Sequence, residues 1–241
     1  MNILLTGASR GLGLEICKTL LNRGDTVFAV SRNLSSPLEK LAAEFPERLK
    51  FKSADLSNPE EARKAIFAED FVSFATQLDG FVSNAASAYD DIITNIAPDK
   101  LRAMFETNVF APMLLTKYAI RNMILHKTRG AIVHISSVSV HTGYKGLAMY
   151  AASKGAVEAF SKNTAREWGA KGIRSNAVAA GFMQTDMSAS LSGKQRAKIY
   201  ARTSLKSETS AASVAGTVAF LLSDAAASIT GQTVAVDSGT I

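Results

Sequence analysis

The sequence predicts an α/β fold built on one doubly wound parallel sheet of about seven strands, flanked by helices. Short apolar runs alternate with longer segments of helical periodicity along the whole chain of 241 residues. A glycine-rich turn joins the first apolar run to the first helical segment, an order typical of doubly wound sheets. No repeat, charge run or Gly/Ser tract divides the chain, so we expect residues 1–241 to form a single domain.

The apolar runs give the expected strands, which are residues 3–5, 27–30, 49–52, 80–82, 131–135, 174–178 and 233–236. Helical patterns lie between them at 12–21, 37–45, 59–76, 98–126, 149–168 and 211–222. Pro37, Pro59 and Pro98 suit the first turns of their helices, where a missing N–H leaves no bond unmade. Ser36 and Asn58 precede two of these prolines and are candidate N-caps.

Composition narrows the class of protein. The chain has 27 Lys and Arg against 21 Asp and Glu, and the net charge of +6 mildly favours acidic partners. Neither a secretory leader nor an apolar run of membrane-spanning length is visible, and no nucleic-acid motif is present. Cys17 has no second cysteine to pair with, which fits a reducing cytoplasm and a core thiol. His126, His134 and His141 are too scattered in sequence to predict a metal site.

The glycine-rich turn Thr6-Gly7-Ala8-Ser9-Arg10-Gly11-Leu12-Gly13 is the first functional motif. Glycines let a backbone approach a pyrophosphate, and the following helix would offer free N–H groups and a positive dipole end. The spacing is G-x3-G-x-G, and a tight turn without a ligand is the plain alternative. The position after the first strand of an alternating chain favours the ligand.

Charge at the end of the second strand predicts the choice of dinucleotide. An acidic residue about 20 positions after the glycine turn usually binds the ribose hydroxyl of NAD, whereas a basic residue accommodates the phosphate of NADP. Here the strand ends Val30-Ser31-Arg32-Asn33, without an acid. Ser31 and Arg32 can bind phosphate, and Arg10 could close over it, so we expect NADP(H). An ordinary solvated role for Arg32 is the alternative.

Tyr150 and Lys154 form the second motif, because on a helix they share one face about 5–6 Å apart at Cβ. Lowering a tyrosine pKa from about 10 towards 7 takes about 4 kcal/mol. One positive charge ~4 Å away gives about 4 kcal/mol at an effective dielectric near 20. The pair therefore predicts a tyrosine that acts as an acid, although many exposed helices carry this spacing by chance.

The chain resembles the short-chain dehydrogenase/reductase family over essentially its whole length, and within it the beta-ketoacyl-acyl-carrier-protein reductases. The matching landmarks are residues 6–13, Ala54-Asp55-Leu56, Ser83-Asn84-Ala85-Ala86, Thr107-Asn108-Val109, Ile135-Ser136-Ser137, residues 150–154, and Ala180-Gly181-Phe182 with Thr185. Two positions depart from the family. Ala86 replaces a usual glycine, which could narrow the approach to the adenosine ribose, and Ala180 replaces a usual proline, which could loosen the turn beneath the nicotinamide.

This resemblance implies a Rossmann-type fold and a catalytic set of four residues. Tyr150 would donate a proton to the substrate carbonyl, while Lys154 lowers the tyrosine pKa and holds the nicotinamide ribose. Ser137 would bind the same carbonyl oxygen, and it is preferred to Ser136 and Ser139 because its separation from Tyr150 matches the family. Asn108 would anchor a water that leads protons to the lysine.

The resemblance also implies the cofactor site. The expected cofactor-binding residues are Gly7, Ser9, Arg10, Gly11, Leu12, Gly13, Ser31, Arg32, Asp55, Leu56, Asn84, Ala85, Ala86, Tyr150, Lys154, Gly181, Met183 and Thr185. Asp55 would contact the adenine amino group, although an N-cap role is its plain alternative.

The expected function is an NADPH-dependent carbonyl reductase, with a 3-oxoacyl thioester as the favoured substrate. Alternatives are the same chemistry on another alcohol, sugar or secondary-metabolite ketone, or a nucleotide-binding protein without catalysis. A lid is expected at about 185–205; its basic residues could welcome a phosphopantetheine-linked chain or simply form a solvated helix face.

Assembly and partner are implied by the family as well. The helical segments 98–126 and 149–168 would build a homotetramer, using apolar positions that include Met104, Phe105, Phe110 and Val157. Internal core is the alternative for these side chains. Lys127, Arg129 and Lys171 resemble the family's basic docking site for an acyl carrier protein.

Overall fold

The computed structural model describes residues 1–184 and 192–241, and it contains one seven-stranded sheet in the order β3-β2-β1-β4-β5-β6-β7. Every pair of neighbouring strands is parallel. The strands are β1 (Asn2–Thr6), β2 (Thr26–Ser31), β3 (Leu49–Ser53), β4 (Gly80–Ser83), β5 (Ala131–Ser137), β6 (Arg174–Ala180) and β7 (Thr233–Val236). The predicted doubly wound parallel sheet is confirmed.

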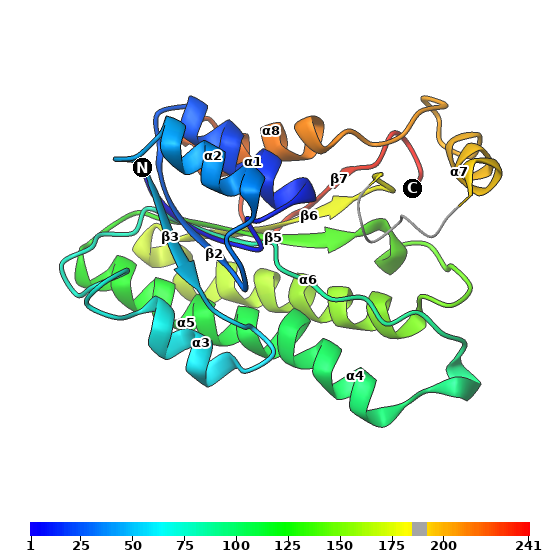
Figure 1. Cartoon of the computed structure of the whole chain (residues 1–241), viewed down its shortest axis with the longest axis horizontal. Helices are drawn as coiled ribbons and strands as arrows, with labels where there is room; N and C mark the ends of the chain where they lie inside the picture. Colours follow the sequence, from blue (N-terminus) through cyan, green and yellow to red (C-terminus); the bar gives the residue numbers. More distant parts are fainter. Residues whose placement is uncertain (185–191) are drawn as a thin grey trace.

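Helices cover both faces of the sheet, as Figure 1 shows. One layer contains α1 (Gly11–Asn22), α2 (Ser36–Glu44) and α8 (Ala211–Leu222). The opposite layer contains α3 (Pro59–Ile66), α4 (Pro98–Phe105), α5 (Ala111–Leu125) and α6 (Ala148–Trp168). The short α7 (Gly193–Tyr200) stands apart at the end towards which the arrowheads of β5 and β6 point. Because both faces are covered, the central strands β1, β4, β5 and β6 are buried almost throughout.

The order of the strands fixes where a ligand can bind. The chain runs outward from β1 to β3 and then returns to place β4 on the other side of β1. The loops that leave β1 and β4 therefore diverge to opposite faces and open a crevice beyond the carboxyl ends of these strands. The glycine-rich turn follows β1, and Asn84 follows β4, so both lie at this crevice.

Two predicted helices differ from the observed ones. The helix expected at 59–76 ends at Ile66, and the irregular segment after it is held by the Asn122 side chain. The Oδ1 atom of Asn122 accepts from the Leu78 N–H at 2.9 Å, and its Nδ2 donates to the Thr76 carbonyl at 2.8 Å. The helix expected at 98–126 is interrupted by a π-helical turn, Glu106–Phe110. Single π turns are frequent at functional sites, and this one contains Asn108.

The predicted helix caps need two corrections. Ser35, and not Ser36, is the N-cap of α2, and its Oγ accepts from the Leu38 N–H at 3.4 Å. Asn58 does occupy the N-cap position of α3, but its side chain makes no capping bond. Instead the Asp55 Oδ1 accepts from the Ser57 N–H at 3.0 Å and closes the turn that leads into this helix.

Candidate functional site

The glycine-rich turn forms a tightly packed cradle at the start of α1. Gly7 and Gly11 have φ angles of +72° and +53°, in the left-handed region that favours glycine. A Cβ on Gly13 would lie 1.9 Å from the Gly7 carbonyl oxygen, so no larger residue fits there. Arg10 occupies the N-cap position without a side-chain capping bond, and the first turn of α1 contains no acid. The N–H groups at this helix end therefore face the crevice, as binding of an anion requires.

Thr6 and Asn84 hold this cradle against β4. The Thr6 Oγ1 accepts from the N–H groups of Asn84 and Ala85 at 3.1 and 3.2 Å. The Asn84 Nδ2 donates to the carbonyls of Thr6 and Gly7 at 3.0 and 3.1 Å. Both amide hydrogens of Asn84 are thus committed to the loop. Whatever Asn84 contributes to a ligand, it first fixes the shape of the phosphate cradle.

The residues expected to bind the adenosine half of the cofactor lie at the ends of β2 and β3 and in the loops that follow. Ser31 is buried and donates to the Asn33 carbonyl at 2.9 Å, whereas Arg32 and Asp55 are exposed at the ends of β2 and β3. The Ser53 Oγ donates to the Arg32 carbonyl at 2.6 Å, so the backbone of Arg32 is fixed while its guanidinium is exposed. Leu56 is buried in the core between the sheet and the helices α3 and α5, so only its backbone can face a cofactor.

The end of β6 completes the crevice. Gly181 is packed so closely that an added Cβ would meet the Thr209 Oγ1 at 2.2 Å, and its N–H donates to the Val236 carbonyl at 2.9 Å. The turn after Ala180 is therefore closely packed, and Ala180 pairs with strands on both sides. Whether alanine loosens this turn relative to proline stays a prediction. Met183 is partly buried against the core cluster to which α1 and α8 contribute. The predicted Thr185 and the first part of the lid lie outside the described residues.

Ser137, at the end of β5, is presented as a hydrogen-bond donor. Its Oγ accepts from the Ser139 N–H at 3.2 Å and from the Ser139 hydroxyl at 2.9 Å. A hydroxyl has two acceptor sites and one hydrogen, so the Ser137 hydrogen is left to donate. Ser136 is buried and donates to the Glu158 carboxylate. These contacts support the choice of Ser137 over Ser136 and Ser139.

Tyr150 and Lys154 lie in the first two turns of α6, as the spacing predicts. The Lys154 Nζ is 5.8 Å from the centroid of the Tyr150 ring and donates to the Ile135 carbonyl at 2.8 Å. Burial lowers the pKa of Lys154 to about 8. An ammonium has three hydrogens, so two remain available to a ligand.

The electrostatic prediction for Tyr150 is wrong for the side chains of this chain alone. Burial, with a smaller contribution from the Asp90 carboxylate, raises the pKa of Tyr150 to about 12. Desolvation disfavours the phenolate, and the nearby lysine stands over the ring while bonded to a carbonyl. A lowered pKa therefore needs a second positive charge beside the phenol.

Asn108 joins three parts of the site. Its Oδ1 accepts from the Ser87 N–H and its Nδ2 donates to the Ser87 carbonyl, both at 2.8 Å. The same Nδ2 donates to the Ser153 Oγ at 3.0 Å, and Ser153 in turn donates to the Tyr150 carbonyl at 2.7 Å. Asn108 thus ties the loop after β4 to the helix that carries Tyr150. Both its amide hydrogens are used, so a water anchored here would meet an oxygen acceptor of Asn108.

Sequence reasoning missed Glu158, which is buried one turn beyond Lys154. Its Oε1 accepts from the Ser136 hydroxyl and lies 3.1 Å from the His141 Nε2, and its Oε2 lies 3.5 Å from the Thr233 Oγ1. Glu158 therefore joins α6 to β5, to β7 and to the loop that follows Ser137. A charged residue on the buried face of a helix, four positions after the lysine, was the available signal.

The remaining predicted residues lie away from the crevice. Arg129 precedes β5 and Lys171 precedes β6, so both are at the amino ends of the strands whose carboxyl ends carry Ser137 and Gly181. Arg129 lines a surface hollow of about 460 Å³ together with Met1, Arg23, Asp79, Ser223 and Asp224. These residues therefore lie at the opposite end of the strands from the catalytic residues of the same chain.

The single cysteine belongs to the core and not to the site. Cys17 is buried, and burial raises the pKa of its thiol to about 12, as a core cysteine requires. Within the described ranges, no cluster of His, Cys, Asp and Glu could hold a metal ion. None of the described helices combines the length and apolar character that a bilayer crossing needs.

Comparison with known proteins identifies relatives of the whole chain. The protein family described as enoyl-(acyl carrier protein) reductase, adh_short_C2, matches residues 7–240. The 3-oxoacyl-[acyl-carrier-protein] reductase FabG of Escherichia coli (strain K12) is 37% identical over 238 residues, which cover 98% of this chain and 95% of the relative.

Solved structures of the same fold include dehydrogenases of different names, one with NADP and another with NADH. A gluconate 5-dehydrogenase from Burkholderia cenocepacia J2315, in complex with NADP and tartrate, superposes with a TM-score of 0.91 at 27% identity, covering 99% of this chain and 94% of the other. A 4-hydroxyisoleucine dehydrogenase complexed with NADH also gives a TM-score of 0.91, at 25% identity, covering 99% of this chain and 98% of the other. Fold alone therefore does not select the substrate.

Proposed function

Because the chain belongs to the short-chain dehydrogenase/reductase family, we propose that it is an NADPH-dependent reductase of 3-oxoacyl thioesters. The observation that carries this proposal is the convergence of Ser137, Tyr150, Lys154 and Asn108 beside a glycine cradle at one crevice. The relationship to 3-oxoacyl-[acyl-carrier-protein] reductases over nearly the full length supports the acyl substrate.

The residues present fit a dinucleotide phosphate. The cradle leaves no room for a side chain at Gly13 and exposes the uncapped end of α1, which suits a pyrophosphate. The exposed Arg32, with no acid at the end of β2, suits a further phosphate on the ribose. The two uncommitted hydrogens of Lys154 suit the ribose beside the nicotinamide.

NADPH, when bound, supplies the hydride and a nicotinamide ring that becomes positively charged as the hydride leaves. Ser137 donates its free hydrogen to the substrate carbonyl oxygen and fixes its position. Tyr150 donates its phenolic proton to the same oxygen. Lys154, held by the Ile135 carbonyl, stabilises the phenolate that remains, and Asn108 keeps the catalytic helix and the Ser87 loop in register.

The reductase assignment is tested by NADPH oxidation with a panel of ketones. The panel comprises an acetoacetyl thioester, a keto sugar acid and a neutral cyclic ketone. We expect the thioester to give the largest kcat/KM. Turnover of the sugar acid alone would favour a sugar dehydrogenase, and dinucleotide binding without turnover of any ketone would favour the non-catalytic alternative.

Arg32 provides a direct test of cofactor choice. Replacing Arg32 with aspartate should shift the ratio of kcat/KM for NADPH over NADH by about tenfold or more, because a carboxylate repels the phosphate and accepts from a ribose hydroxyl. Lys40→Asp, on the exposed face of α2, is the matched control for the change in charge. A ratio that moves equally in both variants would remove Arg32 from the phosphate site.

A homotetramer is part of the proposal, and the apolar surface of the α4–α5 region supports it. Phe110 is 50% exposed, and it lines a hollow of about 240 Å³ with Leu101, Arg102, Phe105 and Glu106. Met104 and Val157, in contrast, are buried within the chain, so they cannot contact a partner subunit. Pairing this surface about a two-fold axis would set the helices of two copies antiparallel.

Antiparallel pairing would also place the proposed basic docking residues near a catalytic crevice. Arg129 and Lys171 lie at the opposite end of the sheet from Tyr150, and a two-fold axis across α4 and α5 would bring them towards the crevice of the partner subunit. We therefore propose that an acidic acyl carrier protein docks on one subunit and delivers its chain to the other, in the cytoplasm.

Charge reversal tests this docking. In the double variant Arg129→Glu and Lys171→Glu, kcat/KM for a carrier-bound substrate should fall about tenfold more than for the same acyl group on a small thiol. The loss should shrink as salt is raised, because surface charges are screened. The double variant Lys18→Glu and Lys40→Glu makes the same change in net charge elsewhere. Equal losses on both substrates would refute the docking and leave the reductase assignment intact.

A further inference from the structure

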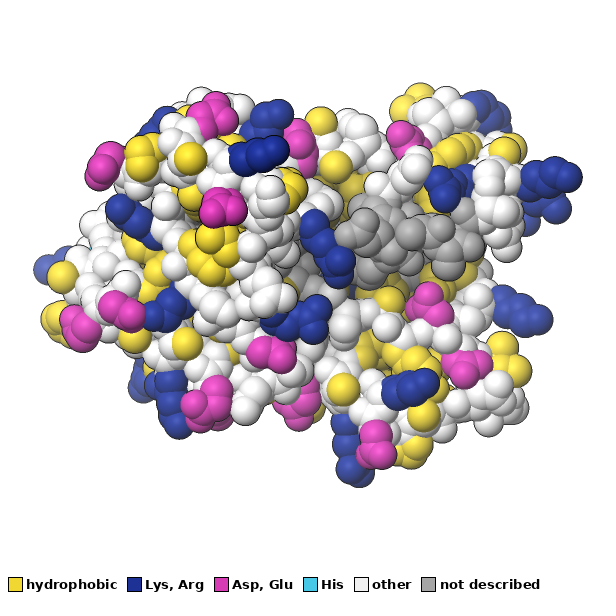
Figure 2. Space-filling view, in the orientation of Figure 1, with side chains coloured by type: hydrophobic (Ala, Val, Ile, Leu, Met, Phe, Trp, Pro, Cys, Tyr) yellow, Lys and Arg dark blue, Asp and Glu magenta, His cyan; other side chains and the backbone are white. Residues whose placement is uncertain are grey.

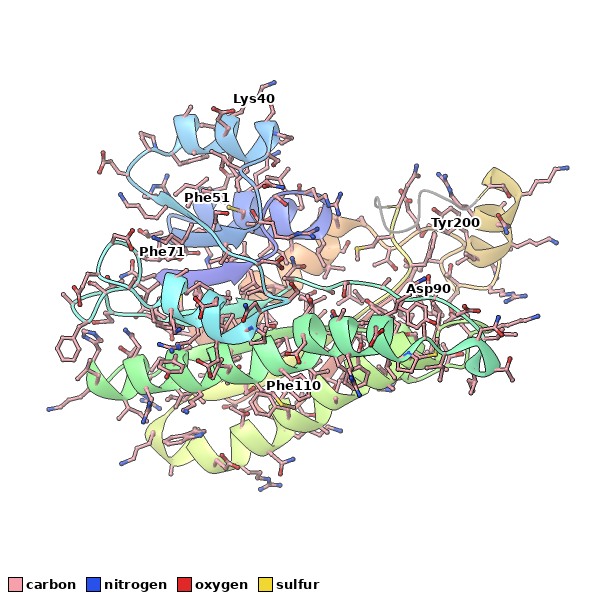
Figure 3. The ribbon with its side chains drawn as sticks, turned by 60° about the horizontal axis from the view of Figure 1, so that its bottom comes forward. Lys40, Phe51, Phe71, Asp90, Phe110 and Tyr200 are labelled. Atoms are coloured by element: carbon pink, nitrogen blue, oxygen red, sulfur yellow. The ribbon has the colours of Figure 1, made fainter. Side chains whose placement is uncertain are left out.

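Asp90 is an acidic residue of the crevice that the proposed mechanism does not use. It lies in the loop after β4, at the end of the molecule that carries α7 (Figure 3). In the part of the chain that the structure describes, its carboxylate makes no hydrogen bond or ion pair. Asp91 differs, since its Oδ1 accepts from the Ile92 N–H at 2.8 Å and from the Asn95 Nδ2 at 3.2 Å. Asp91 shapes the loop, whereas Asp90 presents an unpaired charge.

The loop that carries Asp90 is fixed on both sides. On one side, the two bonds between Ser87 and Asn108, each 2.8 Å, clamp it to the π-helical turn. On the other, the Asp91 N–H donates to the Gly146 carbonyl at 3.0 Å. Gly146 precedes Tyr150 by four residues, at the start of the catalytic helix. Asp90 itself is exposed, but the backbone on both sides of it is fixed, beside the segment that leads into the helix of Tyr150.

The charge of Asp90 reaches the reacting group. After burial, its carboxylate is the charged group that raises the pKa of Tyr150, so its charge acts on the phenol that is proposed to donate to the substrate oxygen. Partial burial also raises the pKa of Asp90 itself, and no counter-charge offsets this effect. A second negative charge brought to the same entrance would be repelled.

We propose that Asp90 determines specificity by excluding ketones and alcohols that carry a negative charge close to the reacting carbon. The site would then favour 3-oxoacyl groups masked as neutral thioesters over free 3-oxo acids and sugar acids. This proposal rests on the reductase function above and adds the class of substrate that the entrance admits.

The test uses two 3-oxobutanoyl ketones, one charged and one neutral beside the reacting carbonyl, and compares their ratio between variants so that their other differences cancel. Acetoacetate is the anion, and an acetoacetyl thioester of a small neutral thiol is its uncharged counterpart. In Asp90→Asn, the ratio of kcat/KM for acetoacetate over the thioester should rise about tenfold at low salt and less at high salt. Asp99→Asn, on exposed α4, is the control and should leave the ratio within about twofold. An unchanged ratio in Asp90→Asn would overturn the proposal.

A second measurement separates this proposal from the reductase assignment. Spectroscopic titration of the tyrosines, with Tyr150→Phe subtracted, reports the ionisation of Tyr150 without any turnover. Removing the Asp90 charge should make Tyr150 ionise at a lower pH. If the wild type reduces neither ketone, the proposed function fails, and this titration still decides whether Asp90 acts at the site. No change in the titration would refute the role of Asp90.

Discussion

Replacing Tyr150 with phenylalanine should lower turnover by two to four orders of magnitude, because general acid catalysis typically contributes about 10²–10⁴-fold. The ring and its packing remain, so binding of NADPH and the melting temperature should change little. Steady-state kinetics, NADPH titration and thermal unfolding of the same preparation separate these effects. Tyr118→Phe, on α5 against Phe67, is the matched control and should keep its turnover.

The structure sharpens the meaning of this experiment. With the side chains of the chain alone, burial and Asp90 raise the pKa of Tyr150 to about 12, so the phenol is firmly protonated. Reduction needs a protonated donor, and the positive charge that develops on the nicotinamide would help its proton to leave. Wild-type turnover in Tyr150→Phe would remove the tyrosine from the mechanism and leave Ser137 as the group that contacts the carbonyl.

The second large effect concerns His134, which is fully buried in β5 between the rings of Phe81 and Phe160. Burial, with a contribution from Lys154, lowers the pKa of His134 to about 4 from 6.5. Below pH 6.5, His134 of the unfolded chain therefore binds a proton, whereas His134 of the folded chain becomes protonated only near pH 4. Stability that is present above pH 6.5 is lost as the pH falls, by about 2 kcal/mol between pH 7 and pH 5.

Urea unfolding at constant protein concentration measures this loss. The free energy of unfolding of His134→Phe should depend less steeply on pH than that of the wild type, by about 2 kcal/mol between pH 7 and pH 5. His126→Gln is the control, because this ring lies near the surface beside the Phe74 carbonyl. Parallel pH profiles for wild type and His134→Phe would show that His134 accepts a proton in the folded state.

The charged surface around the crevice was readable in part from the sequence. Lys and Arg side chains gather over α7, as Figure 2 shows, and this helix carries the predicted basic residues Lys194, Arg196 and Lys198. Arg129 and Lys171 were selected from the resemblance to the family, and their docking role stays a proposal. The sequence did not show how far these residues lie from Tyr150. A residue next to a strand can lie at either end of the sheet until the direction of that strand is known.

Local patterns determined the fold class, the glycine cradle and the Tyr150–Lys154 pair. Each depends on residues within a few turns of one another, where helix and strand periods fix the geometry. Ser137 was chosen differently, because its separation from Tyr150 matches the family that the chain resembles; the expected strand 131–135 stops two residues short of it, and β5 extends to Ser137. The limits of local reasoning appear at residues 59–76, where the Asn122 side chain, from α5, stabilises a non-helical path.

Only the tertiary structure decided the electrostatics of the site. The sign of the pKa shift of Tyr150 follows from desolvation and from Asp90, which lies 60 positions earlier in the chain. The role of Glu158 depends on β7, and the clamp of Asn108 depends on the loop after β4. Burial and charge depend on how segments that are far apart in the sequence pack together. The sequence therefore identified the reacting groups, whereas this packing determined their proton affinities.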